Sequence, residues 1–219
     1  GLNLIVSDGK AVGVAPWQRS PINEGKLCPK GMTCWEFIHS PDRLTKPLIK
    51  KNGKFEEASW DEALDLVAKK FKEIAEKHGP KSLGFQVSCR TPNEECYIMQ
   101  KLARVGFLTN NVDNCARICH GPSVAGLSLS FGSGAATNPF EDVLNSDFIL
   151  VWGSNAVEAH PLAGRRIAQA KMKGIPVMVV DPRYSATARL ADTWVRFNPS
   201  THIALINSIM YWIIQENLH

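Results

Sequence analysis

The alternation of apolar segments in the last third of the chain constrains its fold most strongly. Residues 147–152 and 175–180 are near-continuous apolar runs, and a helical pattern from Leu162 to Lys173 lies between them and ends at Gly174. A strand, a helix and a strand of these lengths form a parallel crossover, because parallel neighbours need a long connection. The sequence therefore predicts an α/β fold with a parallel sheet here.

The first part of the chain predicts a small β-rich unit instead. Apolar residues 4–6 and 11–14 flank the Asp8-Gly9 pair, and such a dipeptide favours a tight hairpin turn. A loop rich in glycine and proline follows, and Asn52-Gly53 marks a second short hairpin. We place the first domain boundary after residue 46.

Helical periodicity begins after residue 58. Ser59, followed three positions later by Glu62, predicts a capping box at a helix N-terminus. Apolar side chains then recur at helical spacing and predict a buried stripe formed by Trp60, Leu64, Val67, Phe71 and Ile74. We also expect a strand at 83–87, helices at 93–107 and from Gly121 onward, and a final helix at 201–216.

Charge and hydropathy exclude several classes of function. The net charge is only +4 and no run of Lys or Arg occurs, so we expect no nucleic-acid partner. The longest apolar stretch, from Ile203 to Ile214, contains Asn207 and Ser208 and is too short for a membrane span, so we expect a buried helix. Six cysteines in a chain of 219 residues favour reduced thiols or metal ligands over a disulfide framework. We expect a cytoplasmic location, and any targeting signal would precede Gly1.

Two cysteine-containing segments are candidates for metal chemistry. Cys28 lies in the loop Gly25-Lys26-Leu27-Cys28-Pro29-Lys30-Gly31, where small residues would let the backbone approach a cluster. One cysteine cannot hold a cluster, and this loop alone favours a cysteine with nothing bound. Cys119 precedes a helix N-terminus and is flanked by Arg117 and His120, which would favour its thiolate as a nucleophile or metal ligand. An inert cysteine beside a hydrogen-bonded histidine is the alternative.

Polar residues follow the two predicted parallel strands. Gly153, Ser154 and Asn155 follow the first strand, and Asp181, Pro182 and Arg183 follow the second. Ligands of open parallel sheets bind beyond the carboxyl ends of the strands, where Asp181 could accept hydrogen bonds and Arg183 could meet a phosphate. Neither strand precedes a Gly-x-Gly-x-x-Gly sequence, which argues against a nicotinamide site. A capping Asp and a surface Arg remain the alternative interpretation.

Taken together, these motifs resemble the molybdenum- or tungsten-dependent formate dehydrogenases, bis-pterin oxidoreductases of the dimethyl sulfoxide reductase superfamily. The run Cys119-His120-Gly121-Pro122-Ser123-Val124 is the most specific part of the resemblance, which covers nearly the whole chain. The other segments that carry it are residues 25–31, 59–64, 99–101, 110–127, 181–183 and 187–189.

The resemblance implies a role for each candidate residue. Cys119 would ligate Mo or W, and His120 would handle a proton or polarise the substrate beside the metal. Cys28 would be the fourth ligand of a [4Fe–4S] cluster, and Lys30 would lie between that cluster and one pterin. The residues implied to contact the molybdopterin guanine dinucleotide are Lys30, Arg90, Gly153, Asn155, Glu158, Asp181, Pro182, Arg183, Ser200 and His202.

The resemblance also implies a domain organisation and partners. We expect a small β-rich cluster domain over residues 1–46, followed by parts of two αβα domains with parallel sheets over 47–114 and 115–219. The other three cluster cysteines would precede Gly1, and the remainder of the catalytic subunit would follow His219. Formate would be the substrate, and electrons would pass to an electron-transfer subunit of the iron–sulfur, flavin or deazaflavin type.

Two other functions are compatible with the sequence. Nitrate reductases of the same superfamily share the neighbourhood of Cys119 but usually lack the following histidine. A noncatalytic module that binds zinc through Cys115, Cys119 and His120 is the second alternative, although the usual paired ligand spacing is absent.

Overall fold

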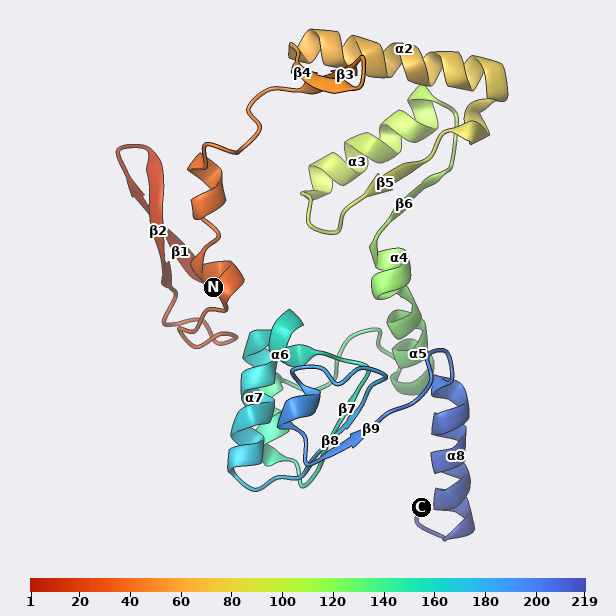
Figure 1. Ribbon diagram of the computed structural model, residues 1–219. Helices are drawn as coiled ribbons and strands as arrows, with labels where there is room; N and C mark the ends of the chain where they lie inside the picture. The colour runs from red at the N-terminus through yellow and green to blue at the C-terminus, as the bar shows by residue number, and fades with distance from the viewer. The chain divides into compact units, whose positions relative to one another are not determined.

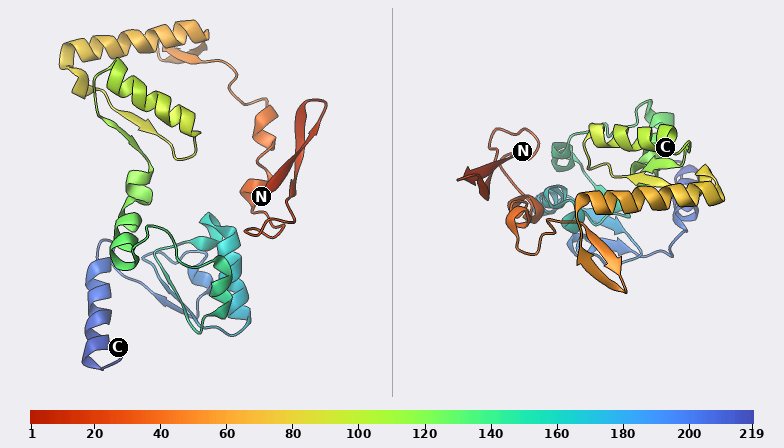
Figure 2. Two further views of the ribbon diagram at one scale, coloured as in Figure 1. Left: turned by 180° about the vertical axis from the view of Figure 1, so that it is seen from behind. Right: turned by 90° about the horizontal axis from the view of Figure 1, so that it is seen from above.

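A computed structural model describes all residues 1–219 as a mixed α/β protein (Figures 1 and 2). The chain forms two compact units, one made of Gly1–Arg43 together with Asn138–His219 and the other of Leu44–Thr137. Two antiparallel hairpins and two parallel sheets confirm the expected fold class. The expected domain boundaries at residues 46 and 114 remain a prediction.

The first unit combines a hairpin with a parallel three-stranded sheet. The antiparallel pair forms as predicted, with Asp8 and Gly9 at positive φ in its turn. The sheet has the order β7-β8-β9, and α7 connects its first two parallel strands. The elements of this unit are β1 (Leu2–Ser7), β2 (Lys10–Pro16), α1 (Pro29–Met32), β7 (Ile149–Trp152), α6 (Ala156–Ala159), α7 (Pro161–Met172), β8 (Val177–Val180), β9 (Thr193–Val195) and α8 (His202–Gln215).

The second unit contains a hairpin, two strands and four helices. Its parallel pair β5-β6 aligns Val87 with Asn114. A short π-helix, Leu102–Gly106, continues the helix that was predicted over residues 93–107. The elements are β3 (Leu48–Lys51), β4 (Lys54–Glu57), α2 (Trp60–His78), β5 (Phe85–Val87), α3 (Asn93–Lys101), β6 (Val112–Asn114), α4 (Ala116–Cys119) and α5 (Gly121–Phe131).

The main core lies between α7 and the three-stranded sheet, which are seen together in the lower part of Figure 1. Val177 and Val179 of β8 are almost fully buried there because β8 is the central strand. Its other buried members are Val151, Ala156, Ile167 and Ala188. The main core thus lies within the βαβ unit, whose presence the sequence predicted.

The predicted buried stripe on α2 is largely wrong. Trp60 is 67% exposed, and Leu64, Val67 and Ile74 are exposed as well. Only Phe71 packs into an aromatic cluster, with Phe85 and Phe107 at centroid distances of 5.6–5.8 Å. The reason is length: 19 residues make a helix of roughly 28 Å, whereas the three-residue strands β5 and β6 extend only about 10 Å.

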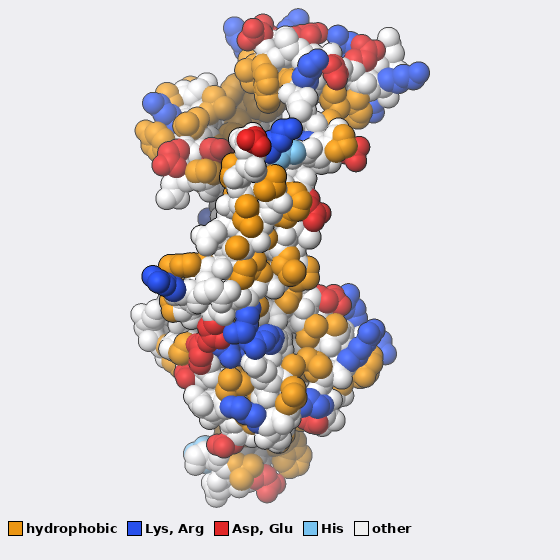
Figure 3. Space-filling view, turned by 90° about the vertical axis from the view of Figure 1, so that its left-hand side faces the viewer, with side chains coloured by type: hydrophobic (Ala, Val, Ile, Leu, Met, Phe, Trp, Pro, Cys, Tyr) orange, Lys and Arg blue, Asp and Glu red, His pale blue; other side chains and the backbone are white.

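The predicted burial of the last helix is also wrong. None of the residues of α8 is buried, and Ile203, Ile206, Tyr211 and Trp212 are all exposed. The helix connects to the sheet through Phe197, whose ring lies 4.6 Å from that of His202. Figure 3 shows hydrophobic side chains spread widely over one face of the chain. Helices long and apolar enough to span a membrane are absent.

Candidate functional site

The Cys28 loop has local features of a thiolate ligand. Cys28 is the N-cap of α1, and its carbonyl accepts hydrogen bonds from the N–H groups of Gly31 and Met32 at 2.9 and 3.0 Å. A hydrogen bond from the backbone N–H of Gly31 lowers the pKa of the Cys28 thiol, and the backbone N–H and charge of Lys30 add to this effect. Donors that stabilise the thiolate are what an iron–sulfur cluster ligand needs. Cys28 therefore fits the role of a cluster ligand.

Lys30 connects this loop with the start of α7. Its Nζ donates a hydrogen bond of 3.2 Å to the carbonyl oxygen of Ala159, at the end of α6. Cys28 and Lys30 line a shallow apolar pocket of about 260 Å³ together with Phe140 and residues 159–163. Residues of the Cys28 loop and residues of α6 and α7 therefore line the same pocket, and Lys30 contributes a positive charge to it.

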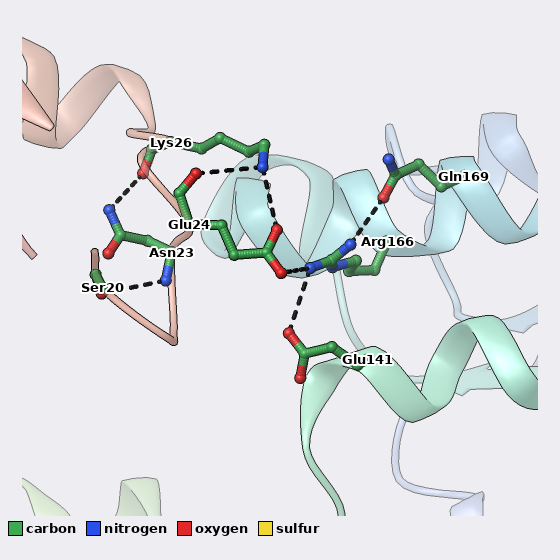
Figure 4. Close-up of polar contacts among 7 residues, drawn as sticks. All are labelled: Ser20, Asn23, Glu24, Lys26, Glu141, Arg166 and Gln169. Atoms are coloured by element: carbon green, nitrogen blue, oxygen red, sulfur yellow. Dashed lines mark hydrogen bonds and ion pairs between the residues drawn. The ribbon is translucent and has the colours of Figure 1, made fainter. Parts of the chain in front are cut away.

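An ion-pair network anchors the segment before Cys28 to α7 (Figure 4). The guanidinium of Arg166 binds Glu24 at 2.7 Å and Glu141 at 3.3 Å, and its side chain is only 13% exposed. On the loop side, the Asn23 amide donates to the carbonyl of Lys26 at 2.8 Å. Hydrogen bonds from Lys26 and Arg166 lower the pKa of Glu24, which keeps the carboxylate ionised. No local sequence pattern marks Arg166, because its partners lie 142 and 25 residues away.

The carboxyl ends of β7 and β8 bring several predicted residues together. Asn155 donates to the Glu158 carboxylate at 2.7 Å, and Arg183 reaches the same oxygen at 3.9 Å. The fully buried Thr187, which the sequence analysis missed, donates its hydroxyl to Asn155 Oδ1 at 3.0 Å and so orients the amide. Because Glu158 and Arg183 are exposed, a ligand at this edge would meet an anchored amide, a carboxylate and a guanidinium.

The remaining predicted contacts of this edge lie in its turns. Gly153 has φ +61° and donates to the Val180 carbonyl at 2.9 Å, a conformation that favours glycine. Asp181 Oδ1 accepts the backbone N–H of Arg183 at 2.8 Å across Pro182. Each of the two strands is therefore followed by a hydrogen-bonded turn.

Ser200 and His202 are placed beside the same edge. The Nδ1 atom of His202 accepts a hydrogen bond of 3.4 Å from the Trp152 indole, at the end of β7. Ser200 has φ +69°, a left-handed backbone that is strained for a residue other than glycine and that is often found at functional sites. The edge therefore collects Gly153, Asn155, Glu158, Asp181, Pro182, Arg183, Ser200 and His202. Such a donor set fits a purine dinucleotide with phosphates.

Cys119 and His120 lie at the junction of α4 and α5 in the second unit. Cys119 is the exposed last residue of α4, and His120 is the N-cap of α5. Arg117 and His120, which the sequence predicts to support the Cys119 thiolate, both have other partners. Arg117 binds Asp113 at 2.8 Å, and His120 Nε2 contacts the Gly134 carbonyl at 3.1 Å.

The zinc alternative requires three ligands that converge. The chain contains no group of three or more His, Cys, Asp or Glu side chains arranged to hold a metal ion, so Cys115, Cys119 and His120 do not form one. Cys115 instead approaches Cys89, whose backbone N–H lies 3.2 Å from its sulfur. Arg90 follows Cys89 at the end of β5, and its N–H donates to the Ser88 hydroxyl at 3.1 Å.

Two known protein families match the chain, one over its first 40 residues and the other over almost all of the rest. The molybdopterin oxidoreductase family matches residues 43–219, and the molybdopterin oxidoreductase Fe4S4 domain matches residues 1–40. The two matches indicate a molybdopterin cofactor and a [4Fe–4S] cluster, in line with the cofactor classes expected from the sequence.

Individual relatives match over the whole chain but extend far beyond it. The chain is 51% identical to the F420-dependent formate dehydrogenase 2 subunit alpha of Methanococcus maripaludis, covering 100% of this chain and 32% of that protein. It is 50% identical to the F420-dependent formate dehydrogenase subunit alpha of Methanocaldococcus jannaschii, with the same coverage. It is 43% identical to formate dehydrogenase H of Escherichia coli, covering 100% and 31%. The chain thus spans about a third of the length of these relatives.

A solved structure shares the fold. The acetylene hydratase from Pelobacter acetylenicus superposes with a TM-score of 0.72 at 26% identity, covering 99% of this chain and 30% of that one.

Proposed function

The chain belongs to the molybdopterin oxidoreductase family, and on this premise we propose that it forms part of the catalytic subunit of a formate dehydrogenase. The supporting observation is identity of 49–51% along the whole chain with three formate dehydrogenase alpha subunits, against 26% with the acetylene hydratase. The reaction is the reversible oxidation of formate to carbon dioxide, one proton and two electrons. When bound, the Mo or W bis-molybdopterin guanine dinucleotide accepts the two electrons, and the [4Fe–4S] cluster passes them on.

Cys119 and His120 are the catalytic pair in this proposal. The Cys119 thiolate ligates Mo or W, for which its exposed position at the end of α4 leaves the sulfur accessible. His120 acts on a proton near the metal. The carbonyl oxygen of Gly134 can only accept a hydrogen bond, so the Nε2 atom of His120 must carry the donated proton. In a neutral imidazole, Nδ1 is then the nitrogen that can act as a base.

The dinucleotide is held by the strand-end residues of the first unit. The Glu158 carboxylate suits N–H and hydroxyl donors of a guanine or ribose, and Arg183 suits a phosphate. Asn155 holds Glu158 in place and is itself held by the buried Thr187. Gly153, Asp181, Pro182, Ser200 and His202 complete the proposed contacts of this unit, and Arg90 of the second unit remains a separate prediction.

Cys28 and Lys30 serve electron transfer. Cys28 ligates the [4Fe–4S] cluster, for which its lowered pKa is suitable. Lys30, whose Nζ donates to the carbonyl oxygen of Ala159, would supply a cationic group between the cluster and one pterin. The proposed electron acceptor is an electron-transfer subunit of the iron–sulfur, flavin or deazaflavin type, and the F420-dependent relatives favour the deazaflavin.

Formate turnover and metal content test the proposal together. The native complex that contains this chain is purified without oxygen and assayed for Mo, W, Fe and Zn. Reduction of a viologen dye and of F420 is then followed with formate as the donor. We expect Mo or W together with Fe, and formate-dependent reduction of both acceptors.

Other outcomes would contradict the proposal in distinguishable ways. Mo or W with nitrate reduction and without formate oxidation would assign the chain to a nitrate reductase. Zinc as the only metal would assign it to a noncatalytic module.

A further inference from the structure

Two cysteines outside the proposed catalytic residues lie together at the ends of β5 and β6. The backbone N–H of Cys89 donates to the sulfur of Cys115 at 3.2 Å, and the N–H of Cys115 donates to the Val87 carbonyl at 3.3 Å. Val87 and Asn114 are aligned in the parallel register; Cys115 directly follows Asn114, and Cys89 lies two residues after Val87. Neither cysteine is in a disulfide in the structure.

The spacing of the two residues is suitable for a disulfide. The Cys89 Cα atom is one bond of about 1.46 Å from a nitrogen that already touches the Cys115 sulfur. The Cys115 sulfur is therefore at most about 4.7 Å from the Cys89 Cα atom, and the Cα atoms of disulfides are usually about 4.4–6.8 Å apart. We propose that Cys89 and Cys115 are a redox modification site that closes to a reversible disulfide.

The geometry of the pair assigns different roles to its two sulfurs. The backbone N–H of Cys89 donates to the Cys115 sulfur at 3.2 Å and would stabilise negative charge that develops on that sulfur. Cys115 is therefore the attacking thiol and Cys89 the resolving thiol.

The chemistry balances with a low-molecular-weight disulfide as the oxidant. The Cys115 thiolate attacks one sulfur of the reagent, whose S–S bond breaks and releases one thiol. Cys89 then loses its proton and attacks the Cys115 sulfur of the mixed disulfide, which releases the second thiol. Two protein thiols are oxidised and one reagent disulfide is reduced to two thiols.

The location makes the pair relevant to the subunit. Cys115 is the N-cap of α4, and its carbonyl accepts the N–H of Cys119 at 3.1 Å. A bond between Cys115 and Cys89 would tie the residue that starts α4 to the end of β5. The thiol chemistry itself does not depend on the proposed formate activity.

Trypsin places each relevant cysteine in a separate peptide, which makes a direct test possible. Cys89, Cys96, Cys115 and Cys119 fall in residues 82–90, 91–101, 105–117 and 118–165, respectively. The native holoenzyme is treated with oxidised glutathione, its remaining thiols are alkylated, and the digest is analysed by mass spectrometry. We expect peptides 82–90 and 105–117 to appear joined, and to separate after dithiothreitol.

Two variants assign the roles. In Cys89→Ser, we expect glutathione to remain attached to Cys115, because the resolving thiol is absent. In the control Cys96→Ser, the linked peptides should form as in the native protein, since Cys96 contacts Thr91 and not a cysteine. The proposal is overturned if Cys89 and Cys115 are both alkylated after oxidation, or if Cys115 is joined to Cys119 instead.

Discussion

At the scale of single residues, His120 carries the most specific part of the proposed chemistry. Its ring is oriented by the Gly134 carbonyl and it starts α5 directly after Cys119. Its position in the sequence, next to the proposed metal ligand, is what separates the formate dehydrogenase interpretation from the nitrate reductase one.

Replacement of this histidine should lower turnover without removing the metal. In His120→Ala, we expect formate oxidation to fall by about 10²–10⁴-fold, the usual contribution of a positioned acid or base, while Mo or W content stays at the native level. Steady-state kinetics and elemental analysis measure the two quantities. His78→Ala, at an exposed position on α2, is the control. Unchanged formate kinetics in His120→Ala would argue against the assigned role.

Asp192 illustrates how one carboxylate supports the central sheet. It accepts the backbone N–H of Val177 at 2.9 Å and pairs with Lys171 at 3.0 Å. These contacts, the first of them foremost, hold the pKa of Asp192 below its ordinary value. A carboxylate whose pKa is lower in the folded than in the unfolded protein stabilises the fold when the pH is above the unfolded-state pKa. This stabilisation is lost as the pH falls through the folded-state pKa.

Asp192→Asn should therefore destabilise the first unit only where the carboxylate is charged. We expect a lower unfolding midpoint than the native protein at pH 7 and convergence of the two midpoints below about pH 4, the unperturbed range of Asp. Thermal unfolding followed by circular dichroism across this pH range measures the difference. A difference that stays constant into acid would show that packing, not charge, is responsible.

At the scale of elements, the contact of α6 with α7 depends on one glycine. A Cβ atom at Gly164 would lie 2.7 Å from Val157 Cα and 2.9 Å from its nitrogen, both backbone atoms. This close approach lets the two helices meet directly after the carboxyl end of β7, where Asn155 and Glu158 are presented.

Gly164→Ala should consequently separate the two helices. We expect a loss of about 1–3 kcal/mol in the free energy of unfolding, typical of overpacking. The control Gly126→Ala has nothing within 4 Å of its added Cβ in α5 and should gain about 0.5–1 kcal/mol from helix propensity. Chemical denaturation measures both. Equal effects of the two substitutions would contradict the close-packing argument.

At the scale of the whole chain, distant segments are joined by few polar contacts. Within the first unit, the Arg166–Glu24 ion pair links residues 142 positions apart and attaches the Cys28-containing segment to α7. Lys30 makes a second link, to Ala159. Large parts of the apolar surface of α2 and α8 remain uncovered.

A double-mutant cycle should reveal this attachment. Arg166→Met and Glu24→Gln should each lower the unfolding midpoint, and the double variant should lose less than the sum, because the two side chains share one interaction. The exposed pair Lys70–Glu73 within α2 is the control, and its removal should have almost no effect. Strictly additive losses for Arg166 and Glu24 would argue against a coupling between the segments.

Local patterns in the sequence determined the type and order of the elements. The Asp8-Gly9 turn, the Ser59 cap that accepts the Glu62 N–H, and the βαβ unit follow from neighbours a few residues apart, and all three are present. The second half of the capping box is not, because Glu62 binds Lys51 at 3.1 Å instead. The close placement of the polar residues that follow β7 and β8 was predictable, because parallel strands have their carboxyl ends at the same edge of a sheet.

Only the tertiary structure decided burial and long-range pairing. Periodicity marks an apolar face on α2 and α8, but it does not say whether another element covers it, and here little does. The partners of Arg166, the support of Asn155 by Thr187, and the Cys89–Cys115 contact join residues 25 to 142 positions apart. Such contacts arise from the way the strands are placed side by side, which no local pattern encodes.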